Sequence, residues 1–318
     1  MKRFKSILVG VDLAEGDRHV VDTIPPSSLK AITRAIWLAK TNAAHLTFLN
    51  VLSPWAPNLD AETQLLVQEG HGQRTVRDHA KEVMAKLVQH ANDEGVRADN
   101  RVVFGKSWME TIRQVIWKQH DLVIVGAKDA SPTHPFSTGS HTVKLLRKCP
   151  CAVWVTKLPP EQKLRSVLVA HDLRPVGDEA MELGGAMAEL HDAELHVLHA
   201  IEYPELDHVF PAPVSDEKAA EYRHEAEQKI NDQLKQFKLS REAHIHFATR
   251  PPDFAIWHCI EQYDIDLLAM GTLGRSGISG MITGNTAERL LPLVPCSILA
   301  VKPSGFQSPV TLPHHHHP

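Results

Sequence analysis

The chain repeats itself after about 150 residues, and this repeat constrains the fold more than any other feature of the sequence. Three pairs of segments match: KSILVGVDL at 5–13 with RSVLVAHDL at 165–173, DLVIVG at 121–126 with DLLAMG at 266–271, and Pro150-Cys151 with Pro295-Cys296. The last two pairs share an offset of 145 residues. An internal repeat of this length indicates one structural unit built twice. We therefore expect two domains, which a chain of 318 residues can hold.

Within each copy, short apolar runs alternate with amphipathic stretches. Nearly continuous apolar strands separated by amphipathic helices are typical of a parallel sheet covered on both faces. The elements expected in the first copy are Ile7–Val11, Leu29–Thr41, Leu46–Val51, Gln73–Asp93, Arg101–Phe104, Trp108–Gln119, Leu122–Val125, His141–Arg147 and Ala152–Val155. Those expected in the second are Val167–Ala170, Glu179–Leu190, Leu195–Ala200, Ser215–Phe237, His244–Phe247, Phe254–Gln262, Leu267–Met270, Thr286–Leu293 and Ser297–Val301. Each copy is predicted to be a five-stranded, doubly wound α/β domain.

Consecutive prolines separate the two copies, in the segment Leu158-Pro-Pro-Glu161. Proline ends regular structure, so this segment is the natural linker. We predict an N-terminal domain over residues 1–158, a C-terminal domain over 163–304 and a flexible tail over 305–318. The tail carries four consecutive histidines but no helix or strand pattern, so we do not count it as part of either fold.

The composition of the chain indicates which kinds of molecule it can bind. The chain is 43% hydrophobic and 23% charged with a formal net charge of −4, and it has no long block of Lys or Arg. This balance argues against binding of nucleic acid or of a membrane surface. No apolar stretch approaches the length of a signal or transmembrane segment, so we expect a cytoplasmic protein with small-molecule or protein partners. The Cys149-Pro-Cys151 sequence is interpreted as packing of small apolar side chains, with metal binding or redox chemistry as the alternative.

A glycine-rich stretch from Gly271 to Glu288 follows the apolar run that ends at Met270 and leads into a helical pattern. Glycines let backbone N–H groups turn toward a ligand, and a helix N-terminus adds further donors and a positive dipole end. The stretch therefore predicts a phosphate-binding loop. The alternative is a capped turn without a ligand, because Asn285 and Glu288 have the spacing of a capping box.

The first copy keeps only part of this pattern. Gly126, Gly139 and Ser140 occupy the corresponding positions, but the middle glycine is replaced by Asp129. A carboxylate there would lie beside phosphate oxygens, and two prolines in the same loop each remove a backbone donor. We expect weak or no triphosphate binding in this half unless Lys128 or a divalent cation offsets the charge.

Two aspartates mark the ends of the first strands, Asp12 in the first copy and Asp172 in the second. Ligands of open α/β sheets bind beyond the carboxyl ends of the strands. If the first and fourth strands of a copy are neighbours, Asp172 and Gly271 line one cleft; the sequence alone leaves this adjacency open. The other role for such an aspartate is to cap the turn that follows it.

Taken together, these motifs resemble the universal stress protein family, in particular members with two domains in tandem. The resemblance rests on the aspartate after each first strand, on the Gly-x2-Gly-x9-Gly spacing of Gly271, Gly274 and Gly284, and on the Pro-Cys pair before each last strand. It covers nearly the whole chain. It implies a Rossmann-like fold with strand order 3-2-1-4-5 and an internal pseudo-dimer of the two halves. It also implies ATP or a related adenine nucleotide as ligand.

The resemblance assigns site residues by position. Asn285 departs from the family pattern, which usually has Ser or Thr directly after the third glycine; here Thr286 comes one place later. The nucleotide-binding residues it implies for the second half are Asp172 and Ala200 on the adenosine side and Gly271, Gly274, Gly284, Asn285 and Thr286 at the phosphates. The positions of the degenerate first site are Asp12, Val51, Gly126, Gly139 and Ser140.

Motifs of catalysis are not found: the chain has no Walker phosphate loop, no nucleophile elbow, no His-Glu-x2-His and no kinase set. We therefore assign no catalytic residue and no metal ligand. Slow ATP hydrolysis or self-phosphorylation is the most activity that we expect, and the sequence does not assign it to particular residues. The interpretation is a stress-response protein that binds ATP, with Mg²⁺ as its accompanying cation, as a regulatory ligand. The alternative is a carrier or protein-interaction module whose loops no longer bind nucleotide. The protein partner and the formation of a homodimer stay open.

Overall fold

Two compact units make up the chain. The computed structural model describes residues 3–13, 24–53, 76–127, 140–157, 163–201, 216–272 and 285–313. One unit comprises Met1–Pro160 together with Gln307–Pro318, and the other comprises Glu161–Phe306. The end of the chain thus groups with the first unit.

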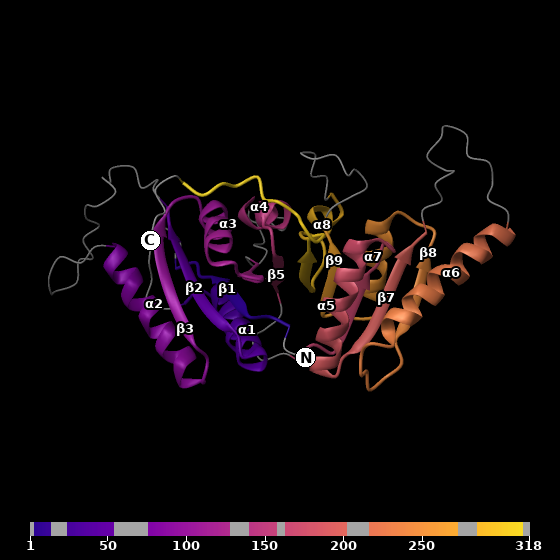
Figure 1. The fold of residues 1–318 in the computed structure, drawn as a ribbon, viewed down its shortest axis with the longest axis horizontal. Coiled ribbons are helices and arrows are strands. Elements are labelled where there is room, and N and C mark those ends of the chain that lie inside the picture. Colours follow the sequence, from indigo (N-terminus) through magenta and orange to yellow (C-terminus); the bar gives the residue numbers. More distant parts are fainter. Residues whose placement is uncertain are drawn as a thin grey trace. The chain divides into compact units, whose positions relative to one another are not determined.

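The first unit is a parallel five-stranded sheet with its helices between successive strands (Figure 1). Its elements are β1 (Ser6–Gly10), α1 (Pro26–Asn42), β2 (His45–Leu52), α2 (Val76–Asp93), β3 (Ala98–Phe104), α3 (Ser107–Lys118), β4 (Leu122–Gly126), α4 (Ser140–Lys148) and β5 (Ala152–Thr156). The strand order is β3-β2-β1-β4-β5, and every neighbouring pair in it is parallel. The predicted order 3-2-1-4-5 is confirmed for this unit.

The second unit repeats this arrangement. Its elements are β6 (Ser166–Ala170), α5 (Pro175–His191), β7 (Glu194–Ala200), α6 (Asp216–Leu234), β8 (His244–Ala248), α7 (Pro252–Gln262), β9 (Leu267–Gly271), α8 (Asn285–Leu290) and β10 (Ser297–Val301). The order β8-β7-β6-β9-β10, again with parallel neighbours, corresponds strand by strand to that of the first unit. Two tandem doubly wound domains are therefore the fold that the periodicity predicted.

The apolar runs form the sheets because both faces of each central strand are covered. Ile7, Leu8 and Val9 of β1 are fully buried, as are Leu267 and Leu268 of β9. Helix α1 packs on β1 and β4, and α5 packs on β6 and β9. A continuous apolar strand is stable only in such a two-sided setting, which explains why these runs do not alternate with polar residues.

Several helices begin earlier than predicted, and proline is the reason. The expected starts were Leu29 for α1 and Glu179 for α5, whereas the helices begin at Pro26 and Pro175. Proline fits the first turn of a helix because the N–H that it lacks would have no partner within the helix there. Helix α8 ends at Leu290, three residues before the predicted limit at Leu293.

Matching aspartates fasten the first strand of each unit at the amino edge of the sheet. Asp121 accepts hydrogen bonds from the backbone N–H groups of Lys5 (2.7 Å) and Ser6 (3.2 Å). Asp266, its counterpart at an offset of 145, accepts the backbone N–H of Arg165 (2.7 Å). The DLVIVG and DLLAMG repeat thus begins with a residue needed for strand attachment rather than for ligand binding.

A turn directs the chain away from β10. Gly305 has a φ of +80°, and the N–H of Phe306 donates to the carbonyl of Pro303 (3.1 Å), as in a type II turn. Beyond it, Ser308, Val310 and Leu312 are half-buried whereas Gln307, Pro309 and Thr311 are exposed. We call residues 307–313 the C-terminal strap. Because 307–313 group with the first unit, the strap joins the end of the second unit back to the first.

Nowhere in the described ranges is there a helix with both the length and the apolar character that a bilayer crossing requires.

Candidate functional site

Strands β6 and β9 lie side by side, which settles the adjacency that the sequence left open. They pair in parallel through Ala170 and Met270, so Asp172 and Gly271 follow neighbouring strand ends at the carboxyl edge of the sheet. The first unit has the same arrangement, with β1 paired to β4 through Val9 and Ile124. The predicted aspartate and the first glycine of the loop are thereby brought together in each unit.

Asp172 occupies the turn after β6 and is exposed. Its Oδ1 accepts the backbone N–H of Arg174 (3.0 Å), while Leu173 between them has a positive φ of 59°. The aspartate therefore caps its own turn, the role given above as the alternative to ligand binding. A capped turn also holds the carboxylate in one place at the edge of the sheet, so the two roles are compatible.

The buried imidazole of His171 holds this turn by a hydrogen bond to its backbone. The N–H of Leu173 donates to His171 Nδ1 (2.9 Å), so the ring proton of the neutral histidine is on Nε2, which donates to Gln233 Oε1 (2.8 Å). The Gln233 amide then donates to Asp178 Oδ1 (2.6 Å). Burial lowers the pKa of His171, which keeps the ring neutral and the hydrogen-bond directions consistent.

A second donor holds the backbone carbonyl of His171. His199, on β7, donates from Nδ1 to this carbonyl (2.8 Å), and the Tyr222 hydroxyl donates to His199 Nε2 (3.2 Å). In the first unit the Asn50 amide on β2 donates to the carbonyl of Val11 (2.9 Å), the residue before Asp12. No sequence motif had marked Asn50 or His199 as part of the site. The sequence feature that could have indicated them is a polar residue near the end of each apolar second strand, Asn50 in β2 and His199 in β7.

The two units differ in how they hold the aspartate itself. In the first, the hydroxyl of Ser28 accepts the N–H of Asp12 (2.9 Å) and donates to its carbonyl (2.8 Å). In the second, Gly177 occupies the position of Ser28, and a Cβ there would lie 2.4 Å from Asp172 Oδ1. The turn of Asp172 therefore lies closer to the first turn of α5 than any side-chain-bearing residue would allow.

The glycines that end β4 and β9 have a packing role. A Cβ on Gly126 would lie 1.9 Å from the carbonyl oxygen of Ser27, and one on Gly271 would lie 2.8 Å from a methyl group of Val176. The start of α1 or α5 thus contacts the strand end directly. Close approach of the helix start, by backbone atoms at Gly126 and by the Val176 side chain at Gly271, is sufficient to explain these two glycines without a ligand.

Lys302 lies next to the first residue of the glycine-rich loop in the second unit. The Thr272 hydroxyl donates to the carbonyl of Val301 (3.0 Å), and the buried Lys302 ammonium donates to the Thr272 hydroxyl. The same ammonium lies 5.4 Å from the centre of the Phe306 ring. A cation is thereby placed at the start of the predicted phosphate loop, and no sequence motif had marked Lys302.

The remaining predicted residues fall into two groups. Val51 in β2, Ala200 at the end of β7 and Thr286 in α8 are half-buried. Ser140 and Asn285 are the first residues of α4 and α8, but their side chains, and that of Glu288, lie outside the described residues. Gly139, Gly274, Gly284, Lys128 and Asp129 also lie outside the described residues, so the phosphate loop and the capping box stay predictions.

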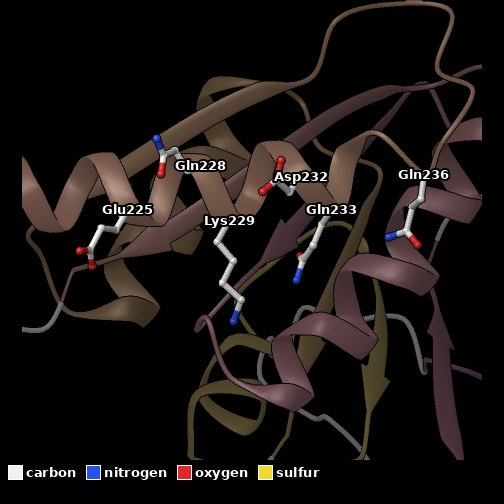
Figure 2. Close-up of a pocket in the computed structure, with 6 residues that line it drawn as sticks. All are labelled: Glu225, Gln228, Lys229, Asp232, Gln233 and Gln236. Carbon is white, nitrogen blue, oxygen red and sulfur yellow. The ribbon is translucent and has the colours of Figure 1, made fainter.

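A polar groove of about 550 Å³ runs along α6 (Figure 2). It is lined by Glu225, Gln228, Lys229, Asp232, Gln233 and Gln236. Figure 2 shows Lys229 and Gln233 pointing from α6 toward the underlying elements. Lys229 donates to the carbonyl of Leu173 (2.6 Å) and lies 3.5 Å from Asp178. The groove is therefore connected to the turn that carries Asp172.

The histidines of β7 lie on the two faces of the sheet, as the alternation of side chains along a strand requires. His196 and His199 face opposite sides of the sheet. The His196 ring stacks with those of His244 (5.0 Å between ring centres), His246 (5.3 Å) and Tyr263 (4.8 Å). Burial, with His246 and His244 nearby, lowers the pKa of His196 to about 4. Within the described ranges, no three His, Cys, Asp or Glu side chains are grouped to hold a metal.

Comparison with known proteins connects this architecture to one family. The family model of the Universal stress protein family matches residues 3–157 and again 163–302. The chain is 25% identical to universal stress protein E of Photorhabdus laumondii, over 98% of both sequences. It is 29% identical to universal stress protein E of Escherichia coli K12, over 69% of this chain and 72% of that protein.

Solved structures share the whole fold. A protein of unknown function from Pseudomonas aeruginosa PAO1 superposes with a TM-score of 0.69 at 22% identity, over 95% of this chain and 94% of that chain. A universal stress protein from Archaeoglobus fulgidus gives a TM-score of 0.64 at 20% identity, over 93% and 98%. At these identities the likeness concerns the fold alone.

Proposed function

Because the chain belongs to the universal stress protein family, we propose that its second half binds ATP or a related adenine nucleotide as a regulatory ligand in a cytoplasmic stress response. The observation that carries the proposal is the pairing of β6 with β9, which brings Asp172 and Gly271 to one edge of the sheet. Open α/β sheets bind their ligands at this edge.

Each residue has a role in the proposed complex. Asp172, held by its capped turn, accepts hydrogen bonds from ribose hydroxyls, and Ala200 at the end of β7 flanks the base. The loop that begins at Gly271 wraps the phosphates with backbone N–H groups of Gly274, Gly284, Asn285 and Thr286. The Lys302 ammonium at the start of this loop offsets part of the phosphate charge.

Mg²⁺ enters this proposal with the nucleotide. Mg²⁺ keeps several waters and is usually bound through substrate phosphates, so the phosphate oxygens supply its ligands here. In the first half, Asp12 is held by Ser28 and the corresponding loop carries Asp129, so we assign nucleotide binding to the second half only.

Calorimetric titration with ATP and Mg²⁺ tests the proposal on the full chain. We expect one site per chain. Gly284→Val should abolish it, and Asp172→Asn, which preserves the cap but removes the charge, should weaken it about 10- to 100-fold. The matched control is Gly139→Val, the same change at the corresponding glycine of the first half. No heat at millimolar ATP, or binding that survives Gly284→Val but not Gly139→Val, would refute the assignment.

A second candidate is a carrier of a polar, non-nucleotide ligand. The groove along α6 favours it, because two carboxylates, three amides and one ammonium group suit a hydroxyl- or amine-bearing molecule better than a triphosphate. Native mass spectrometry of the purified protein separates the candidates. A retained nucleotide supports the first, and a retained non-nucleotide mass that is lost on Gln233→Leu supports the second.

A further inference from the structure

Two cysteines flank a proline where α4 meets β5. Cys149 directly follows α4 and is fully buried, and Cys151 directly precedes β5 and is half-buried. Both residues are in the thiol form, and their Sγ atoms are 3.6 Å apart. A disulfide requires about 2.05 Å, so the two sulfur atoms need to approach by roughly 1.5 Å.

The second unit shows that the fold does not require sulfur at both positions. Leu122 pairs with Ala152 in the first unit as Leu267 pairs with Ser297 in the second, so Pro150 corresponds to Pro295. The equivalent of Cys149 is therefore Val294, which is buried in the same way (2% exposed). An aliphatic side chain fills this place in one unit, whereas a thiol fills it beside a second thiol in the other.

We propose that Cys149 and Cys151 form a redox-active dithiol that hydrogen peroxide converts to an intramolecular disulfide. The Cys151 thiolate attacks the peroxide, the O–O bond breaks, and a sulfenic acid and water are formed once the leaving oxygen takes up a proton. The Cys149 sulfur then attacks the Cys151 sulfur, the S–O bond breaks, and the second oxygen leaves as water with the Cys149 proton. Two thiols are oxidised and one peroxide is reduced to two waters.

The environment sets the rate of the first step. The hydrogen bond between the two thiols and burial both raise the pKa of Cys151, and the thiolate is the reactive form. Oxidation is therefore slow at neutral pH and faster as pH rises. The second step is fast, because the resolving sulfur is already in contact with the oxidised one.

The disulfide would act on α4. The Cys149 N–H closes the last turn of this helix by donating to the carbonyl of Leu145 (2.9 Å). The other end of the helix is Ser140, the residue after the first unit's counterpart of the glycine-rich loop. A helix of nine residues thus connects the dithiol to the loop position, so drawing Cys149 toward Cys151 loosens the last turn of α4.

Intact-mass spectrometry with thiol labelling under denaturing conditions tests the proposal on the full chain. After peroxide treatment we expect the mass to fall by two hydrogens and the number of labelled thiols to fall from four to two. Both changes should be reversed by dithiothreitol. Peptide mapping should place the bond between Cys149 and Cys151, and hydrogen exchange should increase in α4.

The control variant is Cys149→Val, which copies the Val294-Pro295-Cys296 sequence of the second unit and should fold. We expect it to lose the disulfide and to accumulate a sulfenic acid on Cys151, trapped with dimedone. Thermal unfolding of the untreated variant checks that the fold is retained. Loss of two hydrogens in Cys149→Val, or irreversible sulfinic acid in the unmodified chain without a disulfide, would overturn the proposal.

Discussion

The side chain of Gln233 completes the hydrogen bonds that fix the Asp172 turn. It accepts from His171 and donates to Asp178, and it reaches the turn from α6, about 60 residues away in the sequence. Sequence patterns could not predict this link, because a glutamine on a polar helix face has the same pattern whether it meets a partner or solvent.

We expect Gln233→Ala to lower the free energy of unfolding by about 1–3 kcal/mol, because it leaves the Nε2–H of His171 buried without its acceptor. Urea unfolding measures the change. Gln236→Ala, an exposed position one turn further along the chain, is the control and should have little effect. Equal effects of the two substitutions would show that the His171 hydrogen bond does not stabilise the unit.

Acid should destabilise the second unit through His196. Its pKa is about 4 in the folded protein and near 6.5 in an unfolded chain, so the unfolded state takes up the proton first as pH falls. Stability attributable to His196 is therefore complete above pH 6.5 and is lost between 6.5 and about 4. Urea unfolding across this range should show a shallower decline for His196→Thr, which introduces the residue that the first unit has at Thr47. An unchanged decline would exclude His196 as its source.

At the level of secondary structure, the sequence predicted the strands better than the helix ends. Every expected strand is present, because an apolar run buried on both faces has few alternatives. The starts of α1 and α5 were placed too late, because the apolar periodicity begins only after Pro26 and Pro175, although proline is favourable in a first turn. The pairing of β1 with β4 was implied by the family resemblance alone, since hydrophobic periodicity carries no information on which strands are neighbours.

The glycines at the ends of β4 and β9 allow a test of helix–strand contact. Gly126→Ala places a Cβ against a backbone carbonyl, whereas Gly271→Ala places it against the side chain of Val176, which can move. We expect the first substitution to cost about 1–3 kcal/mol or more, and the second to cost less. Urea unfolding of the two variants provides the comparison. A larger loss for Gly271→Ala would contradict the packing explanation.

At the level of the whole molecule, the C-terminal strap should stabilise the unit in which the chain begins. Ending the chain after Phe306 removes the strap alone, including Val310 and Leu312, which are half-buried. We expect a loss of roughly 1–3 kcal/mol in the first unit, with the second unit nearly unaffected. Hydrogen exchange resolves the two units. A chain that ends after Pro313 is the control, and destabilisation confined to the second unit would refute the assignment of the strap to the first.

The strap makes the first unit discontinuous in the sequence. The second unit is not appended to the first but inserted into it, since the chain enters it after Pro160 and returns to the first unit at Gln307. An inserted domain is attached at both ends, so the distance between its termini is restricted. A domain attached by a single linker has no such restriction. A protein fused to the C-terminus would therefore be attached to the first unit, although the last strand in the sequence belongs to the second.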